Sequence, residues 1–341
     1  MSSIREMEKT IDGFARQSLA VVGDVMLDKY IWGRSNRISQ EAPVPVVMVK
    51  DETCVPGGAA NVARNIRSLG GDVGIYGIRG NDQEGVQLEA CLANDGVRTE
   101  TLLASKARAT TVKTRVLAGN QQVVRIDREN TSDVSISERR RMLRALEEAL
   151  KTGKTRAIIL EDYAKGVFSK TFMEKIVGLG HKYNAMTALD PHPHNPFNIK
   201  GLTFMTPNRN EAFALAGIKY VSGCGNPLKD APLLKVAERL MRLWRPKYLL
   251  ITLGAEGMAL FSDNGTGPLH IPTKARQVFD VSGAGDTVMA TMMLALMAGA
   301  APEMAAKIAN HAAGVVVGRV GTSAIEADVL RSAVNEETNG R

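Results

Sequence analysis

The sequence predicts an α/β protein with a mostly parallel sheet, helices on both faces of that sheet and a small second β-sheet beside it. Short apolar segments alternate with helical patterns through most of the chain, as they do when crossover helices join parallel strands. Glycine is abundant, with 32 residues, and aromatic residues make up only 5%, which suits many tight strand-to-helix turns. Two β-rich segments, at about 29–50 and 108–127, interrupt the alternation and are expected to pair as the second sheet.

The first half of the chain begins with a strand expected at 19–23, because this segment is apolar on both faces, as a central parallel strand is. The segment 42–49 is bounded by prolines and is typical of an edge strand. The other elements expected in this half are a glycine-rich turn at 56–61, helices at 62–69 and 83–94, a strand at 74–78 and β-structure over 110–126.

The second half alternates strand and helix more regularly. Strands are expected at 157–160, 186–189, 203–205 and 248–252, and helices at 169–182, 233–244, 286–298 and, as a final pair, within 302–318. Ligands of open α/β sheets bind along the carboxyl edge of the strands, so polar residues at strand ends are candidates for the site. Those residues are Asp24, Asp162, Asp190, Asn208 and Thr252.

The composition excludes several classes of protein. With 44% hydrophobic and 23% charged residues, the 341-residue chain is neither disordered nor fibrous. Its longest apolar stretch, 287–300, is shorter than the ~20 residues that span a bilayer, so we expect a buried helix and no membrane partner. Three widely spaced cysteines and a charged N-terminus favour free thiols in the cytoplasm.

The charge balance favours anionic ligands. The chain carries 43 Lys and Arg against 36 Asp and Glu, a net charge of +7. The basic residues are scattered and do not interleave with aromatic residues, which argues against nucleic acid as a partner. Small phosphorylated ligands remain as candidates.

The segment 280–287 carries the sharpest chemical signal. Gly283 and Gly285 precede a predicted helix, where main-chain N–H groups at the positive end would bind an anion. Asp286 follows directly and could accept a proton from a hydroxyl beside that anion. Phosphoryl transfer needs such donors and such a base. The alternative is an ordinary glycine-rich turn with Asp286 in the first turn of a helix.

Two further patterns each allow a structural and a functional interpretation. Asn208 and Glu211, three residues apart, could hold a hydrated Mg²⁺ or form a capping box at a helix start. Gly57 and Gly58, followed by Asn61, could let a ligand approach the main chain or form a tight entry to a helix. The sequence contains neither GxxxxGK[ST] nor GxGxxG, which argues against a P-loop NTPase and a dinucleotide-binding dehydrogenase.

These motifs together resemble those of the ribokinase-like (PfkB) carbohydrate kinases. The segment 57–63 is similar to the first signature of the family, 280–287 to the second, with Ser282 in place of the usual Thr, and 208–211 to its Asn-x-x-Glu motif. The resemblance implies a ribokinase-like three-layer α/β/α sandwich with a small β-sheet lid. It implies a kinase domain over residues 19–330, with an N-terminal extension at 1–18 and a C-terminal tail at 331–341.

Further segments resemble the branch of the family that phosphorylates D-glycero-β-D-manno-heptose 7-phosphate; they lie at 23–28, 37–46, 120–122, 162–166, 312–318 and 321–323. That resemblance implies transfer of the ATP γ-phosphoryl group to the anomeric C1 hydroxyl, giving the 1,7-bisphosphate for ADP-heptose and lipopolysaccharide core synthesis. Many such kinases are fused to an adenylyltransferase, and this chain is expected to be a stand-alone kinase. Where the family commonly has Lys or Arg after Pro191, this sequence has His192, which would pass a phosphate contact to Lys165 or Arg209.

The resemblance also implies a role for each site residue. Asp286 would be the catalytic base, and the N–H groups of Gly283, Ala284 and Gly285 would form the anion hole. ATP would lie along Thr252, Gly254 and Gly257, with its adenine flanked by Asn310, Ala313 and Val317, and Asn208 and Glu211 would hold Mg²⁺ through water. Sugar hydroxyls would meet Asp24, Asp28, Gly57, Gly58 and Asn61, and the sugar phosphate would meet cations among Arg37, Lys113, Arg115, Arg125 and Lys165.

ATP as co-substrate, Mg²⁺ and, less directly, a monovalent cation are the implied cofactors. The β-rich segments resemble the lid of the family, which often pairs with its copy in a second subunit, so we expect a homodimer. Two alternatives stay open: a kinase for another sugar or nucleoside, such as ribose, fructose or tagatose 6-phosphate, and a non-catalytic sensor on the same fold.

Overall fold

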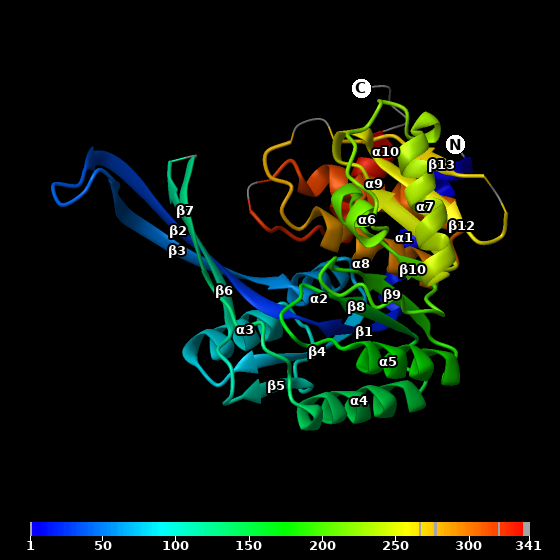
Figure 1. Cartoon of the computed structure of the whole chain (residues 1–341), viewed down its shortest axis with the longest axis horizontal. Coiled ribbons are helices and arrows are strands. Elements are labelled where there is room, and N and C mark those ends of the chain that lie inside the picture. Colours follow the sequence, from blue (N-terminus) through cyan, green and yellow to red (C-terminus); the bar gives the residue numbers. More distant parts are fainter. Residues whose placement is uncertain (1, 120, 266, 276–277, 320, 337–341) are drawn as a thin grey trace.

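A nine-stranded sheet forms the centre of the molecule in the computed structural model, which describes residues 2–119, 121–265, 267–275, 278–319 and 321–336 (Figure 1). The strand order is β13-β12-β11-β10-β9-β8-β1-β4-β5, and all neighbours from β11 to β5 run parallel. Only β12 and β13 are antiparallel. The strands are β1 (Ser18–Gly23), β4 (Asp72–Gly80), β5 (Leu102–Ser105), β8 (Ala157–Glu161), β9 (Met186–Asp190), β10 (Phe204–Met205), β11 (Tyr248–Thr252), β12 (Met258–Ser262) and β13 (Leu269–Ile271).

Helices cover both faces of this sheet, because successive side chains of each central strand point to opposite faces. In β1, Leu19 and Val21 pack into a core with α1, α2, α3, α8, α9 and α10, whereas Ala20 and Val22 pack into a second core with α4, α5, α6 and α7. The helices are α1 (Ser2–Asp12), α2 (Ala59–Ser68), α3 (Gln83–Asn94), α4 (Ile136–Lys151), α5 (Lys170–Lys182), α6 (Arg209–Leu215), α7 (Ala231–Trp244), α8 (Ala284–Met297), α9 (Pro302–Val316) and α10 (Ala327–Asn335). The predicted α/β fold with three layers is confirmed.

Helix α8 explains the long apolar stretch of the sequence. All of its residues from Asp286 to Leu296 are buried between the sheet and its neighbouring helices. It is therefore a core helix, as predicted. Among the described residues, no helix is both long and apolar enough to cross a membrane.

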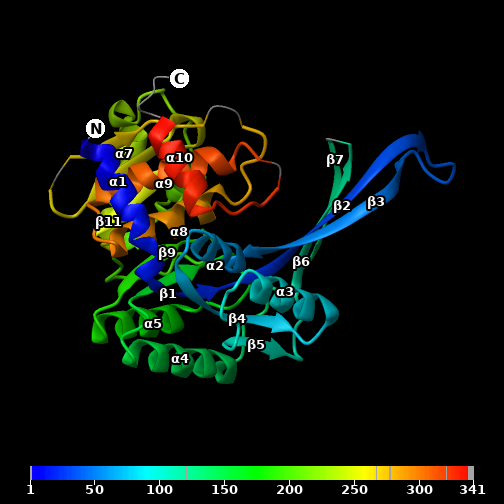
Figure 2. The same cartoon turned by 180° about the vertical axis from the view of Figure 1, so that it is seen from behind.

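The second sheet projects from the body as a long curved arm, which we call the lid (Figures 1 and 2). Its strands are β2 (Val25–Ile38), β3 (Pro45–Gly58), β6 (Thr111–Ala118) and β7 (Gln121–Arg128), in the order β3-β2-β6-β7. The sequence predicted this sheet, although the first hairpin begins earlier and ends later than 29–50. Residue 120, in the predicted second segment, lies outside the described residues.

The structure corrects two predicted elements. The final helix pair within 302–318 is a single helix, α9, and the second helix of this region is α10, which lies beyond a glycine-containing turn at 321–323. The predicted glycine-rich turn at 56–61 is instead the end of β3, up to Gly58, and the start of α2, from Ala59. Two successive glycines favour a turn in a local prediction. Their pairing with β2 joins residues distant in the sequence, so the local pattern does not indicate it.

Both ends of the described chain pack on the body. Met7, Ile11 and Phe14 are buried in the same core as α10, and Arg331 of α10 binds Asp12 at 2.8 Å. The division of the chain into an extension, a domain and a tail stays a prediction, and residues 1 and 337–341 lie outside the described residues.

Candidate active site

The carboxyl edge of the central strands gathers the polar residues that the sequence singled out. Glu161, the last residue of β8, pairs with Gly23 on one side and with Asp190 on the other. Further along the edge, Asn208 and Thr252 form an isolated bridge. The end of α8 that carries Gly283 meets this edge, because Asp286 lies close to both Glu161 and Asp190.

The Asp286 side chain is buried and held by two hydrogen bonds. Asn61 Nδ2 donates to its Oδ2 at 2.6 Å, and the Tyr163 hydroxyl donates to its Oδ1 at 2.7 Å. Burial raises the pKa of Asp286, whereas the bonds from Tyr163 and Asn61 oppose that rise because they favour the charged form. Each carboxylate oxygen is thus oriented by one donor, which fixes the plane of the group.

The glycine turn before Asp286 has the backbone that the sequence suggested. Gly283 caps α8 with φ 78°, a left-handed conformation, and a Cβ atom there would lie 2.8 Å from Asn61 Nδ2. The N–H of Ala284 donates to Val281 O at 3.2 Å, whereas those of Gly283 and Gly285 donate to no described residue. The space beside the Cα atom of Gly285 is open. The predicted anion hole would therefore depend more on the N–H groups of Gly283 and Gly285 than on that of Ala284.

Three acidic residues form a cluster at this position. Carboxylate oxygens of Glu161, Asp190 and Asp286 lie within 4.8 Å of one another. Glu161 is fully buried, and neither of its oxygens has a hydrogen-bond partner among the described residues. Burial and the neighbouring Asp190 and Asp286 raise its pKa well above the ordinary value, and burial and Glu211 do the same for Asp190. Such a cluster is stable only when protons or a bound cation reduce its charge.

Asn208 and Glu211 form a capping box, which is the structural one of the two interpretations that their spacing allowed. Asn208 Oδ1 accepts from the Glu211 N–H at 3.0 Å, and Glu211 Oε2 accepts from the Asn208 N–H at 2.8 Å. The box starts α6 at the sheet edge. Glu211 lies near enough to Asp190 for its charge to raise the pKa of that carboxyl group. Their metal role stays a prediction.

The glycine pair at 57–58 is required by the protein itself. A Cβ atom at Gly57 would lie 2.5 Å from Asp28 Oδ2, and one at Gly58, where φ is 58°, would lie 2.6 Å from Asp24 O. The pair thus lets β3 pass closely over the start of β2. Asp28 is held by Arg115 Nη1 at 2.5 Å and by the Thr322 hydroxyl at 3.3 Å. It is buried at the base of the lid.

Asp24 has a different environment from the one expected. Its carboxylate accepts from the main-chain N–H groups of Tyr163, Lys165 and Val167, at 3.0, 3.0 and 3.3 Å. These bonds fix the loop 162–167, which includes Ala164 in a left-handed conformation with φ 54°. The structure therefore gives Asp24 a role in shaping the loop that carries Tyr163, and its contact with sugar hydroxyls stays a prediction.

Most of the cations expected to bind the sugar phosphate already have carboxylate partners. Arg115 pairs with Asp28, Lys165 with Glu129 at 2.6 Å, and both Lys113 and Arg125 with Asp127 at 3.9 and 3.0 Å. Arg37 is exposed on the lid, far along β2 from its base. Arg209 is also engaged, because its guanidinium is buried against Asp230 at 2.5 Å and Val221 O. Phosphate binding by these residues stays a prediction.

The residues expected to bind ATP lie around the start of β12 and the end of α9. Gly254 and Gly257 have φ values of 61° and 86° in the short turn after Thr252. Asn310 Nδ2 donates to Pro272 O at 2.7 Å, and Val317 O accepts from Phe279 N at 2.8 Å. Helix α9, with Val317 directly after it, therefore holds Pro272 and Phe279, two residues that precede the glycine turn.

Sequence reasoning missed Glu161 and Tyr163 as functional candidates. A signal for Glu161 existed, since an acidic residue directly ends an entirely apolar strand. For Tyr163 there was none, because its bond to Asp286 joins residues 123 positions apart.

Comparison with known proteins decides the family. Residues 16–328 match the pfkB family of carbohydrate kinases. The chain belongs to this family. Its enzyme class, a sugar kinase, follows from that membership.

The curated relatives are longer than this chain. The protein named bifunctional protein HldE of Desulfatibacillum aliphaticivorans is 40% identical over 325 residues, which cover 95% of this chain and 64% of the relative. The protein of the same name from Geobacter sulfurreducens is 40% identical over 305 residues, 89% of this chain and 60% of the relative. The chain thus spans about three-fifths of these proteins.

Solved structures show that the fold is ribokinase-like. The ribokinase of Arabidopsis thaliana complexed with ribose and ATP superposes with a TM-score of 0.70 at 19% identity, over 93% of this chain and 98% of that one. Phosphofructokinase-2 from Escherichia coli in complex with potassium has a TM-score of 0.76 at 18% identity, over 94% and 99% of the two chains.

Proposed function

We propose that this chain transfers the γ-phosphoryl group of ATP to the anomeric C1 hydroxyl of D-glycero-β-D-manno-heptose 7-phosphate. The 1,7-bisphosphate would serve ADP-heptose and lipopolysaccharide core synthesis in the cytoplasm. The observation that carries the kinase reaction is the Asp286 carboxylate, fixed by Asn61 and Tyr163 next to Gly285, whose N–H donates to no described residue. The choice of heptose rests on the sequence segments that resemble that branch and on the relatives named HldE.

In this mechanism Asp286 accepts the proton of the attacking hydroxyl. The bonds from Asn61 and Tyr163 hold the carboxylate in one orientation and favour its charged form, although burial raises its pKa. The N–H groups of Gly283 and Gly285 then donate to the oxygens of the transferring phosphoryl group. Phosphoryl transfer depends mainly on position and electrostatics, so a rigid base and fixed donors are the contributions that the chain has to make.

Mg²⁺ would neutralise charge on the phosphates, and the acidic cluster fits a hard cation. The unpartnered oxygens of Glu161, with Asp190 beside them, are oxygen ligands of the kind that Mg²⁺ prefers, directly or through water. Asn208 and Glu211 would support the same ion from the capping box. A monovalent cation is a further proposal, prompted by the potassium complex of the E. coli phosphofructokinase-2. ATP would lie along Thr252, Gly254 and Gly257 and against α9.

A homodimer formed through the lid is part of the proposal. The lid carries exposed apolar side chains on both hairpins, and β7 is an edge strand that pairs with β6 on one side and with no described strand on the other. Exposed apolar surface and unpaired strand edges favour association. The side chains concerned are Ile38, Met48, Val49, Val124 and Ile126.

The test is ADP release with ATP and Mg²⁺ against a panel of acceptors: heptose 7-phosphate, mannose, ribose, fructose and fructose 6-phosphate. We expect turnover with heptose 7-phosphate. Turnover only with another sugar would keep the role of Asp286 and reject the heptose, whereas no turnover with any acceptor would favour a sensor on the same fold.

A further inference from the structure

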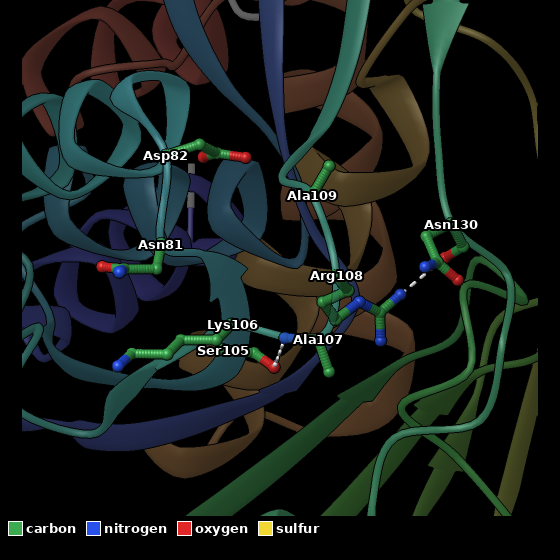
Figure 3. A pocket seen from close by; sticks show the side chains of 8 residues that line it. All are labelled: Asn81, Asp82, Ser105, Lys106, Ala107, Arg108, Ala109 and Asn130. Carbon is green, nitrogen blue, oxygen red and sulfur yellow. Dashed lines mark hydrogen bonds between the residues drawn. The ribbon is translucent and has the colours of Figure 1, made fainter.

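A polar hollow of about 430 Å³ lies where β4 and β5 end, at the base of the lid (Figure 3). Asn81 follows β4, Ser105 ends β5, and Lys106 and Arg108 lie in the loop that leads to β6. Asn130 joins them from the segment after β7. Figure 3 shows Arg108 and Asn130 on one side of the hollow, with Asn81 across from them. None of these residues was among the sequence-based candidates.

Arg108 is held in place by main-chain oxygens and makes no ion pair with a described carboxylate, although Asp24 and Glu138 lie near enough to interact with its charge. Its Nη2 donates to the main-chain oxygens of Asn130 at 2.6 Å and Lys165 at 2.5 Å. Its Nη1 is buried and has no hydrogen-bond partner among the described residues. A fixed guanidinium with an unused buried N–H is suited to an anion that accepts from a planar pair of nitrogens.

Other groups around the hollow can also donate. Lys106 is exposed and makes no ion pair with a described residue. Asn130 Oδ1 accepts from Ser132 N at 2.8 Å, which turns its amide NH₂ to other acceptors. The one carboxylate of the lining, Asp82, is occupied: its oxygens accept from Thr110 N, the Thr110 hydroxyl and Gly85 N. The lining therefore has an excess of positive charge and of free donors.

One short loop connects this hollow to the proposed catalytic base. Arg108 binds Lys165 O, the N–H groups of Lys165 and Tyr163 bind Asp24, and the Tyr163 hydroxyl binds Asp286. A ligand that presents a hydroxyl to Asp286 and extends along this loop would bring its far end towards Arg108. Arg115 is already paired with Asp28, a carboxylate that lies near enough to Asp286 to raise its pKa.

We propose that the hollow around Arg108 and Lys106 binds a phosphate monoester, the phosphate at the far end of a sugar-phosphate acceptor. The proposal rests on the proposed function for the identity of the acceptor. The hollow would then determine specificity, because an unphosphorylated sugar leaves the Nη1 group of Arg108 unpaired.

The test compares Arg108→Gln and Lys106→Ala with the wild type in the ADP-release assay. Lys154→Ala is the matched control, because Lys154 is exposed near the opposite, amino end of β8. We expect Arg108→Gln to raise the KM for heptose 7-phosphate roughly tenfold or more, as loss of a hydrogen bond to a charged group does. Lys106→Ala should raise it about threefold, and the KM for ATP should stay unchanged in both.

A second measurement uses inorganic phosphate and does not depend on turnover. We expect phosphate to raise the Tm of the wild type more than that of Arg108→Gln, since a ligand stabilises only a state that binds it. We expect inorganic phosphate to compete with heptose 7-phosphate, and we expect this competition to be weaker in Arg108→Gln. That result would assign the hollow to the substrate phosphate. Binding of inorganic phosphate without such competition would make it a separate anion site and reject the substrate role.

The failures can be told apart. If the wild type turns over heptose 7-phosphate and Lys106→Ala and Arg108→Gln leave its KM unchanged, the hollow is rejected while the function stands. If only unphosphorylated sugars react, the heptose function is rejected, and the substrate role of the hollow is rejected with it. Equal phosphate binding by the wild type and Arg108→Gln would then also exclude a separate anion site. Should Arg108→Gln unfold, Lys106→Ala decides, because Lys106 is exposed and its loss removes no described contact.

Discussion

Replacement of Tyr163 by Phe tests how the structure tunes Asp286. The Tyr163 hydroxyl donates to Asp286 Oδ1 at 2.7 Å, and this bond lowers the pKa of a carboxyl group that burial raises. Phe keeps the ring and removes only the donor. The pKa of Asp286 should therefore rise, and the fraction of enzyme with an ionised base should fall at each pH below it.

The size of the effect follows from the kind of bond lost. A hydrogen bond to a charged group contributes about 1.5–3 kcal/mol, and one pKa unit corresponds to about 1.4 kcal/mol, so the shift should be about 1–2 units. The acid limb of the kcat profile should move to higher pH by that amount. The KM for ATP should change little, because Tyr163 lies on the side of the proposed base and not along the glycine turn.

The assay is ADP release from about pH 5 to 9 with saturating ATP and acceptor. Tyr183→Phe is the matched control, since Tyr183 also donates to a carboxylate, Glu147 Oε1 at 3.0 Å, but at the end of α5, away from the site. If the acid limb of the kcat profile is the same in Tyr163→Phe, in Tyr183→Phe and in the wild type, the bond from Tyr163 does not set the pKa of the base.

Three more predictions follow from the same structure. Asp286→Asn should lower kcat by roughly 10²–10⁴ with ATP affinity little changed, measured by turnover and nucleotide titration; normal turnover would remove Asp286 as the base. Ile126→Asp on the lid, where Ile126 is 57% exposed, should shift a dimer to monomer in sedimentation, whereas an unchanged mass would reject the lid as the interface. Burial raises the pKa of Asp162 from 3.8 to about 7, so stability should fall as pH rises between these values, by up to about 4 kcal/mol. Asp162→Asn should have a shallower slope in Tm against pH than the wild type, and an equal slope in the two proteins would contradict the shift.

The sequence predicted the helices and most strands well, because the patterns that indicate them lie within a few neighbouring residues. A strand such as β8 is a run of apolar residues bounded by polar ones, and α3 was predicted with its observed bounds. The same holds for the glycine turn before Asp286, where main-chain conformation and helix start are encoded within a few residues. Strand pairing is not local, and for that reason the end of β3 was read as a loop.

The site was less predictable, because its contacts join distant segments. The sequence suggested Arg115 as a phosphate ligand, but could not indicate that Asp28 on the neighbouring strand engages its guanidinium. Nor could it indicate that Asp24 holds the loop 162–167 through three N–H groups. A charged residue in a sequence is only a candidate, and the structure shows which charges already have partners.

The acidic cluster lowers the stability of the folded chain unless a proton or a cation is bound to it. Glu161, Asp190 and Asp286 hold their carboxylates within 4.8 Å of one another in a buried position, and burial with mutual repulsion raises the pKa of Glu161 and Asp190. Without a cation, these groups oppose folding as pH rises, because the unfolded chain releases their protons more readily. A divalent cation that binds only the folded chain removes this penalty and adds its own binding energy. Mg²⁺ should therefore raise Tm more at pH 8 than at pH 6, and Glu161→Gln should reduce that difference, since it removes the one carboxylate of the cluster that is fully buried without a hydrogen-bond partner among the described residues.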